Sequence, residues 1–162
     1  MAVAELIGAT VGVIILVLVA YILIGSTLST AQTVAEAQKD LTLMDESRLR
    51  TDIAISNISE NGDMFTFEIT NTGSEVISDF THMDILVNNG TADYAEYMYT
   101  KTSTGVPGTW TIDGFNQNLH PGRLDPGEKI SCNATYYPGE APVWIQVTTG
   151  NGVYASAYIA SP

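Results

Sequence analysis

The N-terminal part of the chain is almost uniformly apolar between Leu6 and Ile24, and this run contains no charged side chain. Its 19 residues, at a rise of about 1.5 Å each, span close to the ~30 Å hydrocarbon core of a bilayer. A helix buried in the core of a soluble domain is rarely so apolar on every side. The run therefore predicts a helix that is covered by lipid or by other helices.

The helical pattern continues beyond Ile24, because residues 25–50 contain no proline and a narrow apolar stripe recurs at intervals of three and four up to Met44, with Leu49 after it. The stripe consists of Leu28, Ala31, Val34 or Ala35, Gln38, Leu41, Met44 and Leu49. We therefore predict one helix from Glu5 to about Leu49, near 65 Å long at ~1.5 Å per residue, with Gly25 as the position for a bend. Such a helix is a stalk as well as a span, and its stripe favours contact with another helix.

Apolar and polar residues alternate with a period of two after residue 50, which is the pattern of half-buried strands. Strand-like runs cover 53–55, 65–69, 83–87, 94–100, 109–112, 130–136, 143–149 and 153–159. Seven or eight short strands at this spacing predict an all-β, immunoglobulin-like antiparallel sandwich. The predicted core consists of Phe65, Phe67, Ile69, Ile85, Val87, Ile130, Cys132, Val143, Ile145, Val147 and Ile159.

The two patterns divide the chain into an N-terminal helix, residues 1–50, and a β-sandwich domain, residues 51–162. The helix has three interpretations: a cleavable export signal, a membrane anchor, or a helix that packs against copies of itself. A cleavable signal has a basic start and a shorter apolar region, whereas Glu5 makes this start acidic. Gly8 and Gly12 have the G-x-x-x-G spacing that lets helices approach closely in lipid. Glu5, Gly8 and Gly12 are thus the candidate residues for helix assembly.

Charge is concentrated in the second part of the chain. Residues 51–162 carry three bases against thirteen acids, a net charge of −10, compared with −2 for residues 1–50. An acidic surface of this kind disfavours nucleic acid as a partner. The single cysteine, Cys132, cannot form an intrachain disulfide and is predicted to be a small buried residue of the core.

The sequence contains no pattern for catalysis, cofactor binding or a metal centre, so we predict that the protein is not an enzyme. His82 and His120 have no partner at metal-ligand spacing and fit ordinary surface or turn residues. The acids predicted to be solvated in loops, in preference to binding calcium, are Asp113, Asp125, Glu128 and Glu140. In the segment RLDPGEK, Pro126 and Gly127 occupy the positions that a type II turn requires.

The cellular location is indicated by two opposing signals. N-x-S/T sequons, which are candidate N-glycosylation sites, begin at Asn57, Asn89 and Asn133. The bases nearest the apolar run, Lys39, Arg48 and Arg50, follow it, and by the positive-inside tendency they favour a cytoplasmic β-domain. These bases are interleaved with acids, and an acidic, turn-rich sandwich on a stalk favours the outside of the cell.

Several segments together resemble a known family. The acidic start and the apolar helix lead into STAQTVAEAQKDLTLMDESRLRTDIAISNI, and the β-domain contains FEITNTGSEVIS, RLDPGEKISC and VWIQVTTGNGVYASAYI. These segments resemble the archaellum accessory proteins of the F type, which are similar in architecture to archaellins and archaeal type IV pilin-like subunits. The resemblance covers nearly the whole chain. It implies that the helix crosses the membrane and that the sandwich lies in the pseudoperiplasm.

The resemblance leaves two functions open. In the first, the protein is a non-enzymatic archaellum component in the cell membrane, and its external sandwich binds an envelope or surface-layer protein in a stator-like role in motility. In the second, it is a structural subunit of an extracellular helical filament whose core is formed by the N-terminal helices, and Glu5 matches by position the acid near the start of mature pilins. The expected partners are the membrane, the envelope, other archaellum components and further copies of the helix, and no cofactor is expected.

Overall fold

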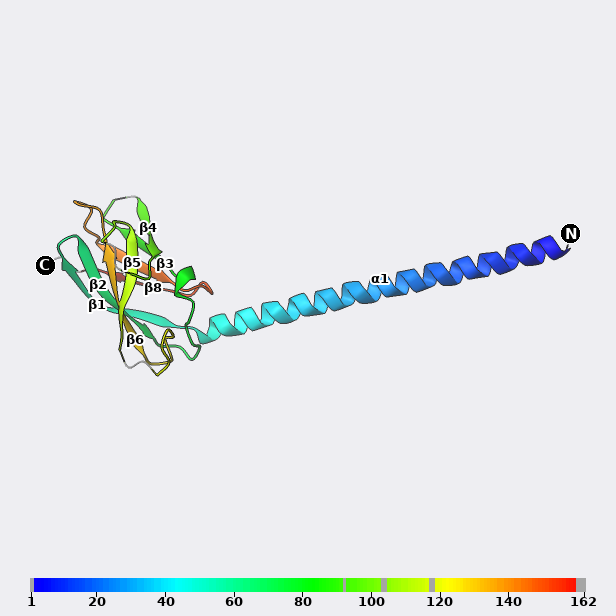
Figure 1. Cartoon of the computed structure of the whole chain (residues 1–162), viewed down its shortest axis with the longest axis horizontal. Coiled ribbons are helices and arrows are strands. Elements are labelled where there is room, and N and C mark those ends of the chain that lie inside the picture. Colours follow the sequence, from blue (N-terminus) through cyan, green and yellow to red (C-terminus); the bar gives the residue numbers. More distant parts are fainter. Residues whose placement is uncertain (1, 92, 103–104, 117–118, 160–162) are drawn as a thin grey trace. The chain divides into compact units, whose positions relative to one another are not determined.

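The computed structural model describes residues 2–91, 93–102, 105–116 and 119–159 (Figure 1). Within these residues, one long helix, α1 (Ala2–Arg50), is followed by eight strands, and a short 3₁₀ helix, η1 (Phe80–His82), lies between the second and the third of them. The chain divides into two compact units, Met1–Met44 and Asp45–Pro162. The last helical residues therefore belong to the same unit as the strands, and the domain boundary after residue 50 stays a prediction.

Helix α1 confirms the predicted continuous helix and is 49 residues long, about 73 Å at ~1.5 Å per residue. It remains helical through Gly25, where the sequence offers a position for a bend. The charges at its two ends complement the helix dipole, because Glu5 lies in the first turn and Arg48 and Arg50 lie in the last.

The strands form one sheet in the order β1-β2-β6-β5-β4-β3-β7-β8. Their bounds are β1 (Ile53–Asn61), β2 (Met64–Asn71), β3 (Asp84–Asn88), β4 (Tyr94–Tyr99), β5 (Thr109–Asn116), β6 (Lys129–Thr135), β7 (Trp144–Thr148) and β8 (Tyr154–Tyr158). Among the described residues, every pair of neighbouring strands is antiparallel except β4 and β5, which run parallel over a short stretch, so the sheet is mixed. Strands β1 and β8, at opposite ends of this order, also contact each other, and the sheet thus curls into a near-barrel (Figure 1).

The tight turns of the β-domain use glycine where the backbone requires a positive φ. The β1–β2 hairpin closes through Gly62 and Asp63, and Gly62 has a φ of 66°. In the predicted turn at Pro126-Gly127, Gly127 has a φ of 82° and the Glu128 N–H donates to the Asp125 carbonyl over 3.0 Å. These values confirm the type II turn, because its third position needs the left-handed conformation.

The core lies inside the near-barrel, where the inward-facing side chains of the strands meet. Ten of the predicted core residues are buried, and Phe65 and Phe67 stack with ring centroids 5.7 Å apart. The buried apolar residues outside the predicted set are Ile53, Ile77, Phe80, Met83, Tyr97, Trp110, Leu124, Ala134 and Tyr136. Burial raises the pKa of the Cys132 thiol. Cys132 is therefore a neutral core residue at physiological pH, as predicted.

Val143 is the exception among the predicted core residues, because its side chain is 36 % exposed. It has the same parity as Ile145 and Val147, which are both fully buried. Strand β7, however, begins only at Trp144, so Val143 lies just outside the strand. Alternation predicts which face of the sheet a side chain lies on. It does not predict whether other side chains bury that position when it lies beyond the end of the strand.

Candidate functional site

The most extensive unusual surface is the apolar part of helix α1. Its large apolar side chains between Val3 and Ile24 are all at least 48 % exposed. The hydroxyl of Thr10, one of only two polar side chains in the 6–24 run, donates to the Leu6 carbonyl over 2.8 Å. That bond removes the need for water at this position. The helix is long and apolar enough to cross a membrane, and its surface requires a cover of lipid or of other helices.

The three predicted assembly residues lie along one side of α1. Positions 5, 8 and 12 follow spacings of three and four residues, which return to the same side of a helix. A Cβ added at Gly8 or Gly12 would meet no atom within 4 Å. These glycines therefore have no packing role within the described chain, and a role in helix assembly stays a prediction.

The three sequons occupy different structural positions. Asn57 is exposed in β1, has a φ of 52°, and lies where the register with β2 shifts. Its amide donates to Glu68 Oε2 over 2.8 Å. Asn89 is half-buried in the turn after β3, and Asn133 lies within β6 between β2 and β5. Asn57 is thus the exposed one of the three, and glycosylation at any of these positions stays a prediction.

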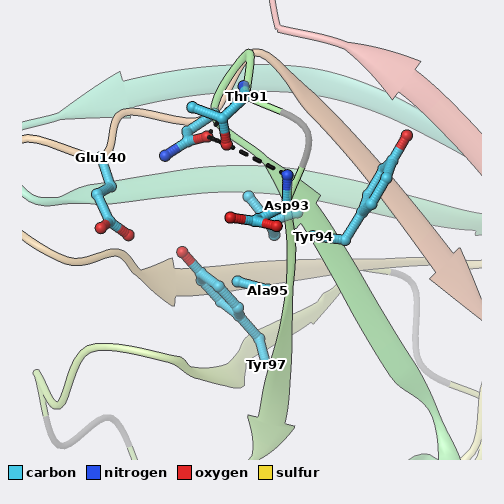
Figure 2. Close-up of a pocket in the computed structure, with 8 residues that line it drawn as sticks. Thr91, Asp93, Tyr94, Ala95, Tyr97 and Glu140 are labelled. Carbon is cyan, nitrogen blue, oxygen red and sulfur yellow. Dashed lines mark hydrogen bonds between the residues drawn. The ribbon is translucent and has the colours of Figure 1, made fainter.

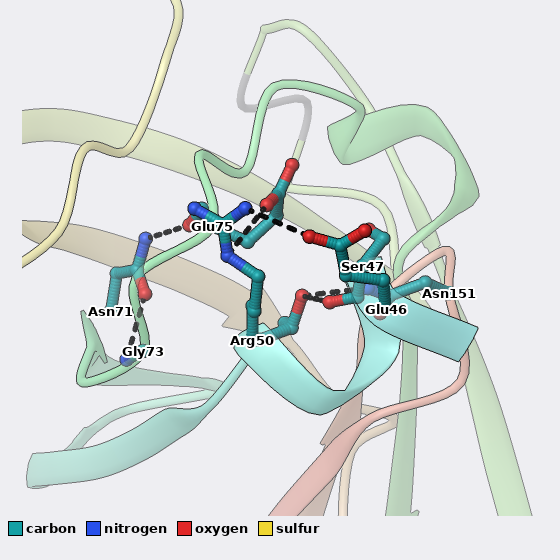
Figure 3. Close-up of polar contacts among 8 residues, drawn as sticks. Glu46, Ser47, Arg50, Asn71, Gly73, Glu75 and Asn151 are labelled. Atoms are coloured by element: carbon teal, nitrogen blue, oxygen red, sulfur yellow. Dashed lines mark hydrogen bonds and ion pairs between the residues drawn. The ribbon is translucent and has the colours of Figure 1, made fainter. Parts of the chain in front are cut away.

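A second feature is the capping of the last turn of α1 by the turn after β2 (Figure 3). The N–H groups of Ser74 and Glu75 donate to the Arg50 carbonyl over 2.8 and 3.1 Å. Just beyond the helix, those of Thr72 and Gly73 both donate to the Asp52 carbonyl over 3.0 Å. A helix leaves its last carbonyls without intrahelical partners, and here a loop distant in sequence supplies donors.

Asn71 holds this capping turn in place. Its side chain is fully buried, and its amide donates to the carbonyls of Glu75 (2.7 Å) and Leu124 (3.0 Å). Its Oδ1 accepts from the Gly73 N–H over 3.1 Å, and its backbone carbonyl accepts from the Gly127 N–H over 2.8 Å. Asn71 therefore links the segment FEITNTGSEVIS to RLDPGEKISC, two segments far apart in the chain.

Side chains add further contacts to the same turn of helix. Arg50 lies between Glu46 and Glu75, at 3.5 and 3.8 Å (Figure 3). The side chains of Arg50 and Glu46 are exposed, and Glu75 is half-buried. Ion pairs of this kind contribute little to stability. Thr51 makes shorter bonds: its hydroxyl donates to the Ser47 carbonyl over 2.8 Å and accepts from the Asn151 amide over 2.7 Å. We call the contacts of residues 46–52 with 71–75 and Asn151 the junction.

Two of the four acids predicted to be solvated are buried, so the expectation for Asp125 and Glu128 is wrong. The Glu128 carboxylate accepts from the N–H groups of Leu119 (2.6 Å) and Asp125 (3.0 Å), which offsets the cost of burying it. His120 Nδ1 lies 2.7 Å from the Asp125 carboxylate. These contacts hold the turn in place. Within the described ranges, no group of three or more His, Cys, Asp or Glu residues is arranged so that it could hold a metal ion.

The other histidine, His82, is exposed and contacts Asp79, with Nδ1 and Oδ2 2.6 Å apart. Hydrogen bonds from Thr81 and His82 lower the pKa of Asp79. Both histidines thus have local carboxylate partners in turns, as expected for surface or turn residues.

The chain thus combines an apolar N-terminal helix with a β-domain that is built from one curled sheet. Residues 4–159 match the archaeal-type flagellin family, and the chain belongs to that family. The protein is therefore archaellum-related and non-enzymatic. An uncharacterized protein of Archaeoglobus fulgidus is 28 % identical over 155 residues, which cover 93 % of this chain and 91 % of the relative.

Solved structures similar in fold come from Sulfolobus acidocaldarius. The archaellum periplasmic stator protein FlaG matches with a TM-score of 0.52 and 18 % identity, covering 67 % of this chain and all but 1 % of its own. A chain in the structure of the FlaF–FlaG stator complex matches with a TM-score of 0.50 and 19 % identity, covering 66 % of this chain and 87 % of its own. At these identities the likeness shows the fold.

Proposed function

We propose that the protein is a membrane-anchored component of the archaellum whose β-domain lies outside the membrane and binds the cell envelope in a stator-like role. The observation that carries this proposal is the exposed apolar surface of α1 in a chain whose acidic β-domain has a hydrophobic core of its own. The likeness to periplasmic stator proteins supports the same function.

The physical argument begins with what covers residues 6–24. Apolar surface in water costs roughly 25 cal/mol per Å². Many side chains here are more than half exposed, so this part of the helix needs a cover. Lipid provides one without any partner, and Glu5 then lies at the interface, where its carboxylate stays in water.

The junction suits an anchored protein that bears load. A force that holds the β-domain to the envelope passes into the membrane helix through residues 46–52. Backbone hydrogen bonds to the Arg50 and Asp52 carbonyls resist separation there without depending on long, mobile side chains. The same capping would serve a filament subunit, so the junction supports a load-bearing role and leaves the choice between the two functions to experiment.

Orientation is tested by protease treatment of intact cells that produce the full chain with epitope tags at both ends. We expect the C-terminal tag and the β-domain to be removed from intact cells while the N-terminal tag is protected. A cytoplasmic protein serves as the control for cell integrity. Protection of the β-domain until the membrane is opened would reverse the orientation and exclude envelope binding.

A second candidate function, a subunit of a surface filament, is favoured by the family match over residues 4–159. In this case identical helices cover residues 6–24. Glu5 would then be buried among them and would need a partner, because an unpaired buried charge costs several kcal/mol. The side of α1 that carries Gly8 and Gly12 would lie where helices touch.

The two functions differ in their response to the double substitution Glu5→Ala with Gly12→Leu. For an anchor, we expect the variant to remain in the membrane fraction in wild-type amounts, because both changes make the helix more apolar. For a filament subunit, the leucine would separate the helices and the charge pairing would be lost, so assembly would fail. Val13→Leu, which also enlarges a lipid-facing side chain, is the control. Electron micrographs of cells with filaments lost only in the double variant would favour the second function.

A further inference from the structure

A pocket with a volume of about 280 Å³ opens beside strand β4, between the β3–β4 hairpin and the loop before β7 (Figure 2). Its lining includes the apolar side chains of Val87 and Ala95 and the polar side chains of Asp93, Tyr97 and Glu140. Hairpin residues and a loop residue more than 40 positions later in the chain thus face one cavity. Both carboxyl groups and the Tyr97 hydroxyl are visible around it in Figure 2.

The hairpin polar groups that line this pocket are already engaged with one another. The Thr91 hydroxyl donates to Asn89 Oδ1 over 2.7 Å, and the Asp93 N–H donates to the Thr91 hydroxyl over 3.4 Å. The carboxylates of Asp93 and Glu140, in contrast, form no ion pair with any residue that the structure describes. No lysine, arginine or histidine is among the lining residues.

Tyr97 is the second and independent observation. Its side chain is only 3 % exposed, and its hydroxyl is directed into the pocket (Figure 2). Among the described residues the hydroxyl has no hydrogen-bond partner, so it is available to a group that enters the pocket. Burial, with a smaller effect of the Glu140 carboxylate, raises the pKa of Tyr97 to about 12, so the phenol is neutral at physiological pH.

We propose that this pocket binds the side chain of an arginine on a protein partner, with the guanidinium group among Asp93, Glu140 and the Tyr97 hydroxyl. The carboxylates offer acceptors only, and the domain carries a net charge of −10, so the complementary group is a cationic donor. The guanidinium provides five N–H donors in a plane, enough for both carboxylates and the phenol oxygen. The apolar wall of Val87 and Ala95 fits the alkyl stem of an arginine better than a hydrated metal ion. The proposal does not depend on whether the helix is an anchor or a filament element.

The test uses the full chain in non-ionic detergent micelles with ¹³C-labelled Ala and Val methyl groups. The probe is the peptide acetyl-Gly-Gly-Arg-Gly-Gly-amide, and its matched control carries citrulline, a neutral analogue, in place of arginine. We expect saturable shifts of the Ala95 and Val87 methyl signals with a Kd near 1 mM for the arginine peptide, and a Kd at least tenfold weaker for the citrulline peptide.

Substitutions of the lining residues then test whether the arginine peptide binds in the pocket. Asp93→Asn and Glu140→Gln should each weaken arginine-peptide binding about tenfold, and Tyr97→Phe about threefold. Glu96→Gln, which removes an exposed acid on β4 next to Tyr97, is the control and should leave the Kd unchanged. Methyl spectra of the free variants show whether the fold is kept.

Three outcomes would overturn the proposal. One is equal binding of the arginine and citrulline peptides, which would remove the role of charge. Another is an equal loss of binding with Glu96→Gln, which would reduce the effect to general attraction by an acidic domain. The third is a set of the same methyl shifts with CaCl₂ and none with the arginine peptide, which would make the pocket a metal site.

Discussion

Replacement of Gly73 by alanine is expected to lower the free energy of unfolding of the β-domain by about 3 kcal/mol. A Cβ at this position would lie 2.5 Å from the Arg50 carbonyl oxygen and would overlap still more with the Asp52 nitrogen. Both are backbone atoms that cannot rotate away, so the capping turn would have to separate from the end of α1. The Thr72, Gly73, Ser74 and Glu75 donors would then lose their carbonyl partners.

The measurement is denaturant unfolding of the full chain in detergent, followed by the fluorescence of Trp110 and Trp144. Both tryptophans lie in the β-domain, so the signal reports its unfolding alone. Gly114→Ala is the matched control, because a Cβ there meets no atom within 4 Å and its φ is not positive. We expect the control to change the free energy by less than about 0.5 kcal/mol. Equal effects of the two substitutions would contradict the close contact between Gly73 and the backbone of Arg50 and Asp52.

The second large effect is expected for Trp110→Ala, which should cost about 3 to 5 kcal/mol. Trp110 is 1 % exposed and packs against Tyr99, with ring centroids 4.8 Å apart. Its backbone carbonyl accepts from the N–H of Thr100 over 2.8 Å, within the short parallel contact of β4 and β5. Removing the indole therefore opens a cavity where the sheet is held by the fewest ladder bonds.

Trp110→Phe is the informative comparison. The indole Nε1 has no hydrogen-bond partner within the described part of the chain, so phenylalanine removes an unpaired buried donor as well as some volume. We expect it to cost less than half as much as Trp110→Ala in the same unfolding experiment, with Trp144 as the fluorescent reporter. A phenylalanine variant as unstable as the alanine variant would indicate that the indole N–H is bonded in solution.

The local patterns of the sequence were sufficient for the helix and for the strands. Hydrophobic periodicity depends on neighbours within a few residues, and such neighbours decide whether a segment such as 65–69 faces a core. Local turn chemistry likewise predicted the turn at Pro126-Gly127. The parallel contact of β4 with β5 was not predictable, because strand order depends on contacts between distant segments.

The junction could not be found from the sequence for the same reason. Asn71, Thr72 and Gly73 are residues typical of turns, but only the folded chain shows that the N–H groups of residues 72–75 bond to carbonyls at the end of α1 and just beyond it. The burial of Glu128 was missed because acids in a Pro-Gly turn are usually solvated. Its two N–H donors come from Asp125 and from Leu119, a residue outside that turn. The only available signal was the dense polar composition of these segments, which does not distinguish a surface loop from a buried network.

The pocket beside β4 could not be predicted from the sequence either. Asp93 and Tyr97 are close in sequence, whereas Glu140 comes from a loop that the topology brings to the same cavity. Alternation along β4 places Tyr97 on the inner side, and only the structure shows that its hydroxyl has no partner among the described residues.

We propose that this member of the archaeal-type flagellin family remains anchored in the membrane by α1. Mechanical shearing of cells, followed by quantitative mass spectrometry of the sheared filaments and of the membrane fraction, tests it most directly. We expect nearly all of the chain to be recovered with the membrane and envelope after shearing. Recovery of the chain as the main repeating subunit of the sheared filaments would contradict it and would make α1 a filament core helix.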